Sequence, residues 1–175
     1  MEDKELIYRI QHGEKELLEE LIQKYYDNIY KFCYYKTGNA SISHDLTQET
    51  FLRVIKYIEN YEHKGKLKNY IVTIAINVCN SYFYKNNTQF EELDNATSDE
   101  STLKEMGTFE QKDIIMKALS ELPEKQKEVI ILKYYEDLKI RDIAKILDEK
   151  VPTVKSRLKQ GLEKLNKSFR KEDFY

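Results

Sequence analysis

"DIAKILDEKVPTVKSRLKQGLEKL", residues 142–165, decides the fold of this chain, because it describes two helices joined by a very short turn. Apolar residues recur at steps of three and four on both sides of the turn, which is the spacing of one helix face. Ala144 is small enough to let the helices approach, and Val154 is placed to fill their crossing. Pro152 lies in the first turn of the second helix, where its fixed φ is accepted. The stretch therefore predicts a helix-turn-helix.

The side of the second helix opposite its apolar residues is polar and basic. Lysine and arginine side chains bind phosphates or guanine edges, and glutamine and serine reach base edges in a major groove. A solvated basic face on an ordinary amphipathic helix is the alternative, but the short turn and the proline at the helix start favour DNA binding. The candidate DNA-contacting residues are Pro152, Thr153, Lys155, Ser156, Arg157, Lys159 and Gln160.

The rest of the chain also predicts helices. Only 5 glycines and 2 prolines occur in 175 residues, too few for many short strands and tight turns. The segment 88–108 is polar and acidic and has little apolar periodicity, which is typical of a flexible linker. We therefore expect an all-α fold with a helical domain at 1–87, a linker at 88–108 and a second helical domain at 109–175.

Three long helices are expected before the linker. The first ends at Gly38, which is suited to a left-handed cap. The second begins near Ser41, with Ser43 as a plausible N-cap. The third runs from Tyr70 to about Lys85.

Composition and charge exclude several classes of protein. The 29 basic and 31 acidic residues give a net charge of −2, so any nucleic-acid contact must come from a local cluster. No apolar run is long enough to span a membrane, and the acidic N-terminus "MEDKELIYRI" does not resemble a signal peptide. We expect a cytoplasmic protein with no membrane contact of its own. Cys33 and Cys79, in apolar runs, are expected to be buried and reduced.

One helix of the N-terminal domain carries an apolar residue in the middle of a polar face. In "HDLTQETFLRVIKYI", Phe51 and Val54 belong to the apolar face, whereas Leu52 lies among charged residues on another side. A leucine ringed by polar groups indicates a protein-binding surface, and a merely solvated face is the alternative. The candidate partner-binding residues are Asp45, Gln48, Glu49, Leu52, Arg53 and Lys56.

The third helix carries a second stripe, of polar and aromatic residues. Side-chain amides can hydrogen-bond exposed base edges, aromatic rings can stack on unpaired bases, and lysines in the preceding loop can bind phosphates. The alternative is a tyrosine-rich helix that packs on its neighbours, since the chain contains 14 tyrosines. The candidate residues for single-stranded DNA are Lys66, Lys68, Asn69, Tyr70, Thr73, Asn77, Asn80 and Tyr84.

No catalytic, metal or cofactor site is expected. The histidines His12, His44 and His63 are scattered and have no metal-like spacing. The sequence contains no phosphate-binding glycine loop and no nucleophile elbow. A nuclease would need a metal-binding carboxylate cluster, which the sequence does not offer.

The segment "ALSELPEKQKEVIILKYYEDLKIRDIAKILDEKVPTVKSRLKQGLEKL" resembles the promoter-binding C-terminal domain of sigma-70-family transcription initiation factors, and "DLTQETFLRV" resembles the family's polymerase-docking segment. The two-domain layout is similar to the extracytoplasmic-function (ECF) group. The resemblance implies three partners: core RNA polymerase, promoter DNA in double-stranded and melted form, and an anti-sigma factor. It assigns the second domain to the upstream (−35) element and the third helix to the downstream (−10) element.

This chain departs from the family pattern at four positions. Asp148 occupies the turn where the family most often has glycine, and a left-handed backbone there would cost about 1 kcal/mol for most residues, less for aspartate. Tyr70, Ile76 and Ser81 stand where tryptophan, arginine and aspartate are common. These departures affect the expected base preference more than the fold. The rival hypothesis is a stand-alone helix-turn-helix regulator that binds a palindrome without polymerase.

Overall fold

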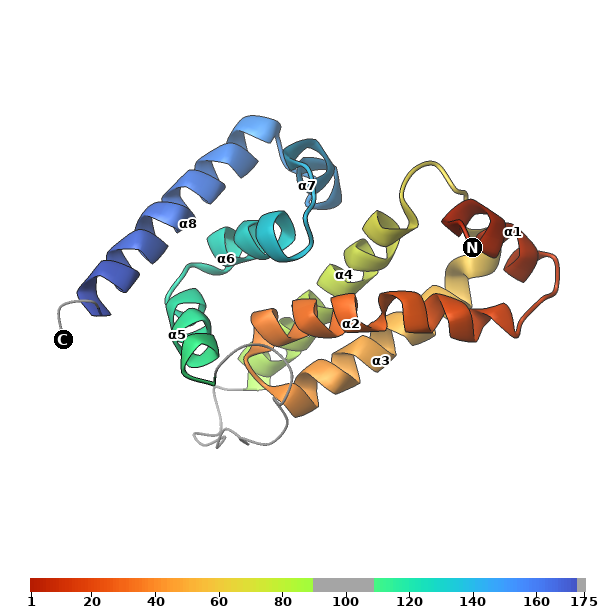
Figure 1. Ribbon diagram of the computed structural model, residues 1–175, viewed down its shortest axis with the longest axis horizontal. Coiled ribbons are helices and arrows are strands. Elements are labelled where there is room, and N and C mark those ends of the chain that lie inside the picture. Colours follow the sequence, from red (N-terminus) through yellow and green to blue (C-terminus); the bar gives the residue numbers. More distant parts are fainter. Residues whose placement is uncertain (90–108, 173–175) are drawn as a thin grey trace. The chain divides into compact units, whose positions relative to one another are not determined.

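The structure is a computed structural model that describes residues 1–89 and 109–172, and every regular element in this part of the chain is a helix (Figure 1). The expected all-α fold is confirmed there. The described chain divides into two compact units. One contains α1, most of α2, α3 and α4, and the other contains α5 to α8 together with the short stretch Tyr34–Ala40.

The first unit is a bundle of long helices. Its elements are α1 (Asp3–Gln11), α2 (Leu17–Thr37), α3 (Ala40–Tyr57), a short 3₁₀ turn (Ile58–Asn60) and α4 (Leu67–Gln89). The core is made by fully buried side chains such as Leu21 and Phe32 of α2, Val54 of α3 and Ile71 of α4. These residues recur at helical spacing within each element, so burying one face of every helix assembles the bundle.

Helix α1 was missed by the sequence analysis, although it completes the core of this unit. Its Leu6 and Ile10 are fully buried. The last residue of α1, Gln11, donates from its side-chain amide to the carbonyl oxygens of Ile58 and Tyr61, at 2.8 Å each. These bonds tie α1 to the end of the 3₁₀ turn and fix the point where the loop before α4 begins.

A second link joins the start of α1 to α2. One carboxylate oxygen of Asp3 accepts from Lys24 Nζ at 2.7 Å, and the other accepts from the buried Tyr25 hydroxyl at 2.7 Å. Burial alone would raise the pKa of Asp3, but the hydrogen bonds from Lys24 and Tyr25 outweigh it and hold the pKa below its ordinary value. Because the folded state favours the ionised carboxyl, this link stabilises the fold above the ordinary pKa and is lost as pH falls through the lowered one.

Asp3→Asn should therefore destabilise the chain by about 1–2 kcal/mol at neutral pH, since the buried Tyr25 hydroxyl loses a charged acceptor. The difference between Asp3→Asn and the wild-type chain should shrink as the pH falls through the lowered pKa of Asp3, because the carboxyl group is then protonated in both states. Urea unfolding at several pH values measures this. A difference that stays constant down to pH 2 would contradict the assignment.

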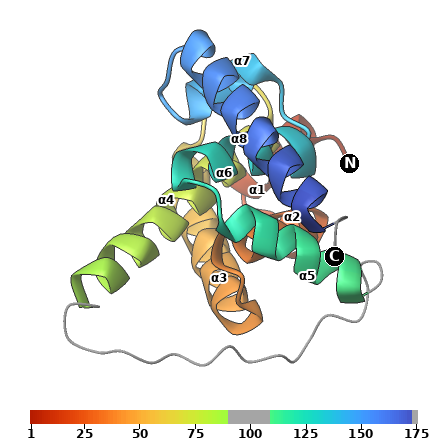
Figure 2. The same ribbon diagram turned by 90° about the vertical axis from the view of Figure 1, so that its left-hand side faces the viewer.

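The second unit is smaller and contains the helix-turn-helix. Its elements are α5 (Phe109–Ser120), α6 (Glu124–Ile130), a π-helical turn (Ile131–Tyr135), α7 (Ile140–Ile146) and α8 (Val151–Glu172). Figure 2 shows α8 crossing α6, with α7 beside the N-terminal end of α8. The core here includes Leu119, Leu122 and Ile130, with Leu158 and Leu165 of α8 packed against it.

Close approach of α6 and α8 depends on one glycine. Gly161 is buried in α8, and a Cβ at this position would lie only 2.6 Å from Cδ1 of Ile130 on α6. Real Cβ atoms do not come this close to a neighbouring carbon, so only glycine fits without movement of Ile130. The glycine costs helix propensity of about 1 kcal/mol, which the closer packing of the two helices offsets.

Three details differ from the expectations. Ser43 lies inside α3 and is buried, so it is not an N-cap; the helix begins at Ala40 because the chain re-enters helix directly after Gly38, whose φ is 68°. Helix α4 continues to Gln89, beyond Lys85 and into the first two residues of the expected linker. The remainder of that linker, 90–108, lies outside the described residues.

Candidate nucleic-acid and partner interfaces

The turn between α7 and α8 has the geometry of a Schellman motif. The N–H of Glu149 donates to the carbonyl of Ala144 at 2.9 Å, and the N–H of Asp148 donates to Lys145 at 3.3 Å. Asp148 has a φ of 51°, which is the left-handed conformation usually given to glycine at this position. The expected left-handed turn is present, and it is formed with aspartate in place of glycine.

Asp148→Gly should stabilise the second unit by roughly 0.5 kcal/mol, because relief of the left-handed strain exceeds the added backbone freedom of the unfolded chain. Thermal unfolding of the full chain measures the change. Asp142→Gly is the matched control: the same replacement within α7 should destabilise, by about 0.5 kcal/mol. A destabilising Asp148→Gly would show that the aspartate side chain contributes more than its backbone costs.

The polar side of α8 lies in solvent, and we call it the α8 face. Its exposed members are Pro152, Lys155, Ser156, Lys159 and Gln160. The structure thus brings together five of the seven predicted DNA-contacting residues on one exposed surface. The other two, Thr153 and Arg157, are only half-exposed.

Gln160 on this face is held by a residue from outside α8. The side-chain amide of Gln126, on α6, donates to Gln160 Oε1 at 3.1 Å, and Gln160 Nε2 lies 3.4 Å from the Ser156 hydroxyl. The Gln160 amide therefore accepts through its oxygen and donates one N–H to Ser156, so its orientation is fixed on the α8 face. Sequence reasoning did not include Gln126, and no local signal could have found it, because it lies 34 residues from its partner.

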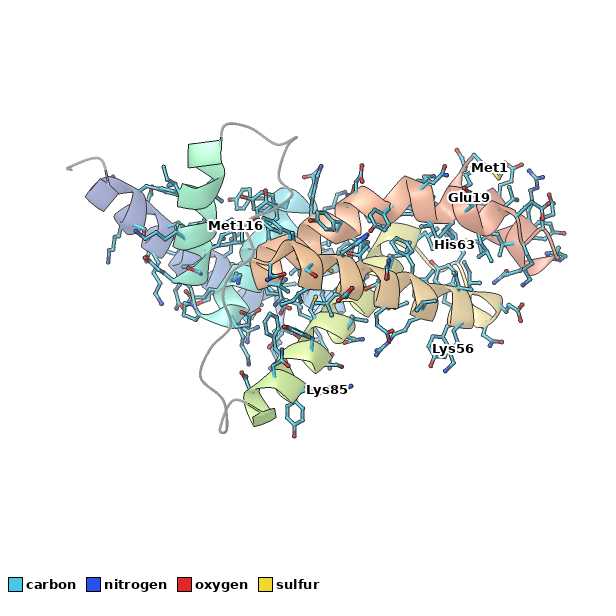
Figure 3. All side chains as sticks on the ribbon, turned by 90° about the horizontal axis from the view of Figure 1, so that it is seen from below. Met1, Glu19, Lys56, His63, Lys85 and Met116 are labelled. Atoms are coloured by element: carbon cyan, nitrogen blue, oxygen red, sulfur yellow. The ribbon has the colours of Figure 1, made fainter. Side chains whose placement is uncertain are left out.

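The predicted partner-binding residues form one surface of α3, which we call the α3 face. Leu52 is 63% exposed, a large fraction for a leucine. It lines a surface pocket together with Glu49, Arg53, Lys56 and Tyr57. Asp45, Gln48 and Lys56 are exposed on the same helix, and Figure 3 shows Lys56 projecting from it.

Tyr57 belongs to the α3 face although the sequence analysis did not select it. Its ring is 49% exposed, lines the Leu52 pocket, and lies 5.4 Å from the Lys56 ammonium. Arg53 Nε donates to Glu49 at 2.7 Å, so these two opposite charges are paired at the pocket rim. The result is an apolar centre of Leu52 and Tyr57 inside a charged border, the arrangement of an interaction hot spot.

The polar stripe of α4 and its preceding loop, which we call the α4 stripe, is exposed along part of its length. Lys66, Asn77, Asn80 and Tyr84 are exposed, and Tyr84 reaches 74%. Lys68, Asn69, Tyr70 and Thr73 are half-exposed. The Thr73 hydroxyl donates to the Asn69 carbonyl at 2.7 Å, so it can only accept further bonds.

Tyr70 is held by stacking within its own unit. Its ring lies 4.3 Å from that of Tyr61, between ring centroids. Burial raises the pKa of the Tyr70 phenol, with a smaller contribution from Tyr57, so the ring remains neutral at physiological pH. Tyr61, at the start of the loop, is itself fixed by the Gln11 bond to its carbonyl.

Ile76 and Ser81 differ in exposure, and neither side chain carries a charge. Ile76 is buried in the core, only 4% exposed, so it contributes packing and offers nothing to a nucleic acid. The Ser81 hydroxyl is turned back to the Asn77 carbonyl at 2.8 Å. Neither position presents a charge, and the neighbouring amides of the α4 stripe carry its polar character.

Neither metal-binding nor membrane-spanning features occur among residues 1–89 and 109–172. No group of three or more His, Cys, Asp or Glu side chains there is arranged to hold a metal ion. The helices in this part of the chain are too short or too polar to cross a bilayer. Cys33 and Cys79 are both fully buried, with their sulfur atoms 3.9 Å apart, and no disulfide joins them.

Comparison with known proteins places both units in one family. Residues 21–88 match the family model "Sigma-70 region 2", and residues 112–165 match "Sigma-70, region 4". The first match covers the α3 face and the α4 stripe, and the second covers the helix-turn-helix. The fold is similar to that of the sigma factor RpoE from Bartonella quintana, solved in complex with the anti-sigma factor NepR, with a TM-score of 0.76 and 21% identity over 87% of this chain and 96% of that one.

Two curated relatives match this chain over nearly their full length. The ECF RNA polymerase sigma factor SigW of Bacillus subtilis (strain 168) is 27% identical over 95% of this chain and 96% of its own length. RNA polymerase sigma factor SigV of the same organism is 26% identical over 91% and 95%. Matches to two regions of one family, in order and over residues 21–88 and 112–165, establish that the protein belongs to the sigma-70 family of RNA polymerase sigma factors, in its ECF group.

Proposed function

We propose that this protein directs core RNA polymerase to specific promoters as an ECF-type transcription initiation factor. The observation that carries the proposal is the presence, in one chain, of a basic helix-turn-helix and of a second helical unit with an exposed apolar centre on α3. A protein that only bound DNA would have no need of the second surface. No step of this function requires catalysis by the chain itself.

The first unit, corresponding to the expected domain 1–87, holds the polymerase through the α3 face. Leu52 and Tyr57 provide the apolar centre, and the charged residues around them exclude wrong partners. The α4 stripe then engages the melted −10 element: Tyr84 and Tyr70 offer rings for stacking, and Asn77 and Asn80 offer amides to base edges. Lys66, just before α4, and Lys68, in its first turn, hold the phosphates.

The second unit, corresponding to the expected domain 109–175, reads the double-stranded −35 element. Lys155 and Lys159 neutralise phosphates, and Ser156 and Gln160 face the base edges. Two separate weak contacts on one promoter explain the net charge of −2, because most of the affinity comes from the polymerase to which both units are attached.

An anti-sigma factor is the expected negative regulator. The Bartonella relative of the same fold was solved bound to one, and an inhibitor that covers the α3 face or the α8 face would prevent promoter binding. We place the protein in the cytoplasm, with the polymerase and the promoter DNA.

Run-off transcription tests the proposal. Purified core RNA polymerase, the full chain and a set of genomic promoter fragments should give discrete transcripts that are absent without the chain. The chain alone should bind these fragments weakly. Strong binding of the chain alone to a palindromic site, with no transcript in the presence of active core, would instead support a stand-alone regulator.

A further inference from the structure

We propose that Arg157 is a positioning residue: it braces the turn of the helix-turn-helix through Glu149 and thereby sets the angle at which α8 enters the groove, without contacting DNA itself. The inference rests on the proposed function and deepens it. The sequence analysis predicted a DNA contact for every basic residue at the start of α8. The proposal gives Arg157 a different role from Lys155 and Lys159.

The ion pair is short and sheltered. Arg157 Nη2 donates to Glu149 Oε1 at 2.7 Å, and the two side chains are 19% and 29% exposed. The other basic residues of the recognition segment, Lys155 and Lys159, are exposed. An arginine that recognises a base needs an unoccupied edge of its guanidinium group. In Arg157, one N–H of that group already donates to the carboxylate of Glu149.

Arg157 also lies on the wrong side of α8 to face a groove. Successive helix residues are separated by about 100° around the axis. Val154 and Gly161 mark the buried side of α8, and Ser156 lies near the centre of its exposed side. Arg157 is therefore about 100° from Ser156 and only about 60° from Val154, on the flank that adjoins the turn.

The other end of the brace is rigidly placed. The backbone of Glu149 is fixed by its hydrogen bond to Ala144, which closes the Schellman motif at the end of α7. Arg157 lies two turns into α8. The pair thus joins the end of one helix to the body of the next, across the connection that contains the strained Asp148. A glutamate just before α8 is also favoured by the positive end of the helix dipole.

The two possible roles of Arg157, direct DNA contact and brace, predict opposite effects of Glu149→Gln on promoter binding. If Arg157 bound phosphate, removing the competing carboxylate by Glu149→Gln would free the arginine, remove a negative charge and strengthen promoter binding. If the pair is a brace, Glu149→Gln weakens recognition despite the more favourable charge. The predictions for Arg157→Ala also differ, because a lost phosphate contact lowers the slope of log affinity against log salt by about one, and a lost brace leaves it unchanged.

The test uses holoenzyme assembled from core polymerase and full-length chain, on the promoter fragment that gives the strongest run-off transcript and on the same fragment with a scrambled −35 element. Measurements are made at 10 °C, where the variants remain folded by circular dichroism.

Glu149→Gln and Arg157→Ala should each reduce the preference for the intact promoter about five- to tenfold. The double variant should be no worse than either single variant. The slope of log affinity against log salt should match that of the wild type. Lys155→Ala, the control, should lower the slope by about one.

Exchange of the two charges provides a rescue that a purely local stability effect would not give. Glu149→Arg with Arg157→Glu should recover part of the preference that each single reversal loses. Tighter promoter binding by Glu149→Gln, or a salt slope lowered by Arg157→Ala as much as by Lys155→Ala, overturns the proposal.

A second measurement keeps the brace testable if the protein proves not to be a sigma factor. Without polymerase or DNA, Glu149→Gln and Arg157→Ala should each lower the midpoint of thermal unfolding of the second unit by about 3–6 °C, and the two shifts should not add. Additive shifts overturn the brace. Absence of any wild-type transcript, with non-additive shifts intact, would overturn the initiation-factor function and leave the ion pair as a structural element.

Discussion

Leu52→Asp is expected to abolish stable binding to core RNA polymerase while leaving the fold unchanged. Leu52 is 63% exposed and belongs to no buried cluster, so the replacement should change stability by no more than about 0.5 kcal/mol. In the complex, by contrast, the side chain is the apolar centre of the α3 face and would be desolvated. A carboxylate there should cost at least 2 kcal/mol, a loss of affinity of about 30-fold or more.

Pull-down of purified core polymerase and the apparent Kd from fluorescence anisotropy measure this loss. Tyr8→Asp is the matched control, because Tyr8 is 60% exposed on α1 of the same unit and lies outside the α3 face. It should bind polymerase as the wild type does. Tyr57→Ala should weaken binding through the same pocket. Normal binding by Leu52→Asp, with circular dichroism unchanged, would move the docking surface elsewhere on the chain.

Gly161→Leu is expected to disrupt the second unit. The new side chain would have to occupy the space of Ile130, whose Cδ1 lies 2.6 Å from the position of a Cβ at residue 161. Overpacking of a buried contact costs about 1–3 kcal/mol, and in a unit this small the midpoint of thermal unfolding should fall by about 10 °C. Hydrogen exchange should show loss of protection in α6 and α8 and little change in α2 to α4.

Gly65→Leu is the control, because a Cβ at Gly65 meets nothing within 4 Å and the same replacement should be nearly neutral. Ile130→Ala should partly relieve the clash, so that the double variant loses less stability than the two single variants together. If Gly161→Leu unfolds at the wild-type temperature, α6 and α8 do not pack as closely as the structure shows.

Local patterns accounted for most of the architecture. The helices α2, α3, α4 and α8 follow from apolar spacing, and the turn at Asp148 follows from the short connection between two such patterns. Helix α1 was not predicted, because the N-terminal segment was considered only as a possible signal sequence. Ser43 was misassigned because a serine near an expected helix start resembles an N-cap, whereas in the structure it is an interior, buried residue.

Pairings across long distances in the sequence were not predictable. Gln126 holds Gln160, and Gln11 holds the carbonyl of Tyr61, over separations of 34 and 50 residues. Polar side chains carry no local periodicity that indicates such partners. Arg157 shows the consequence for a site: its residue type predicts a DNA contact, and its ion pair with Glu149 is the observation behind the different role that we propose for it.

The sequence by itself determined which segments are helices, which face of each is apolar, and that a basic helix follows a tight turn near the C-terminus. These properties depend on the order of neighbouring residues, which hydrophobic burial and backbone sterics translate directly into local structure. The tertiary structure alone decided which polar groups remain free to meet a partner. That outcome depends on distances between side chains that can be remote in sequence, as with Gln126 and Gln160, which are 34 residues apart and bonded to each other.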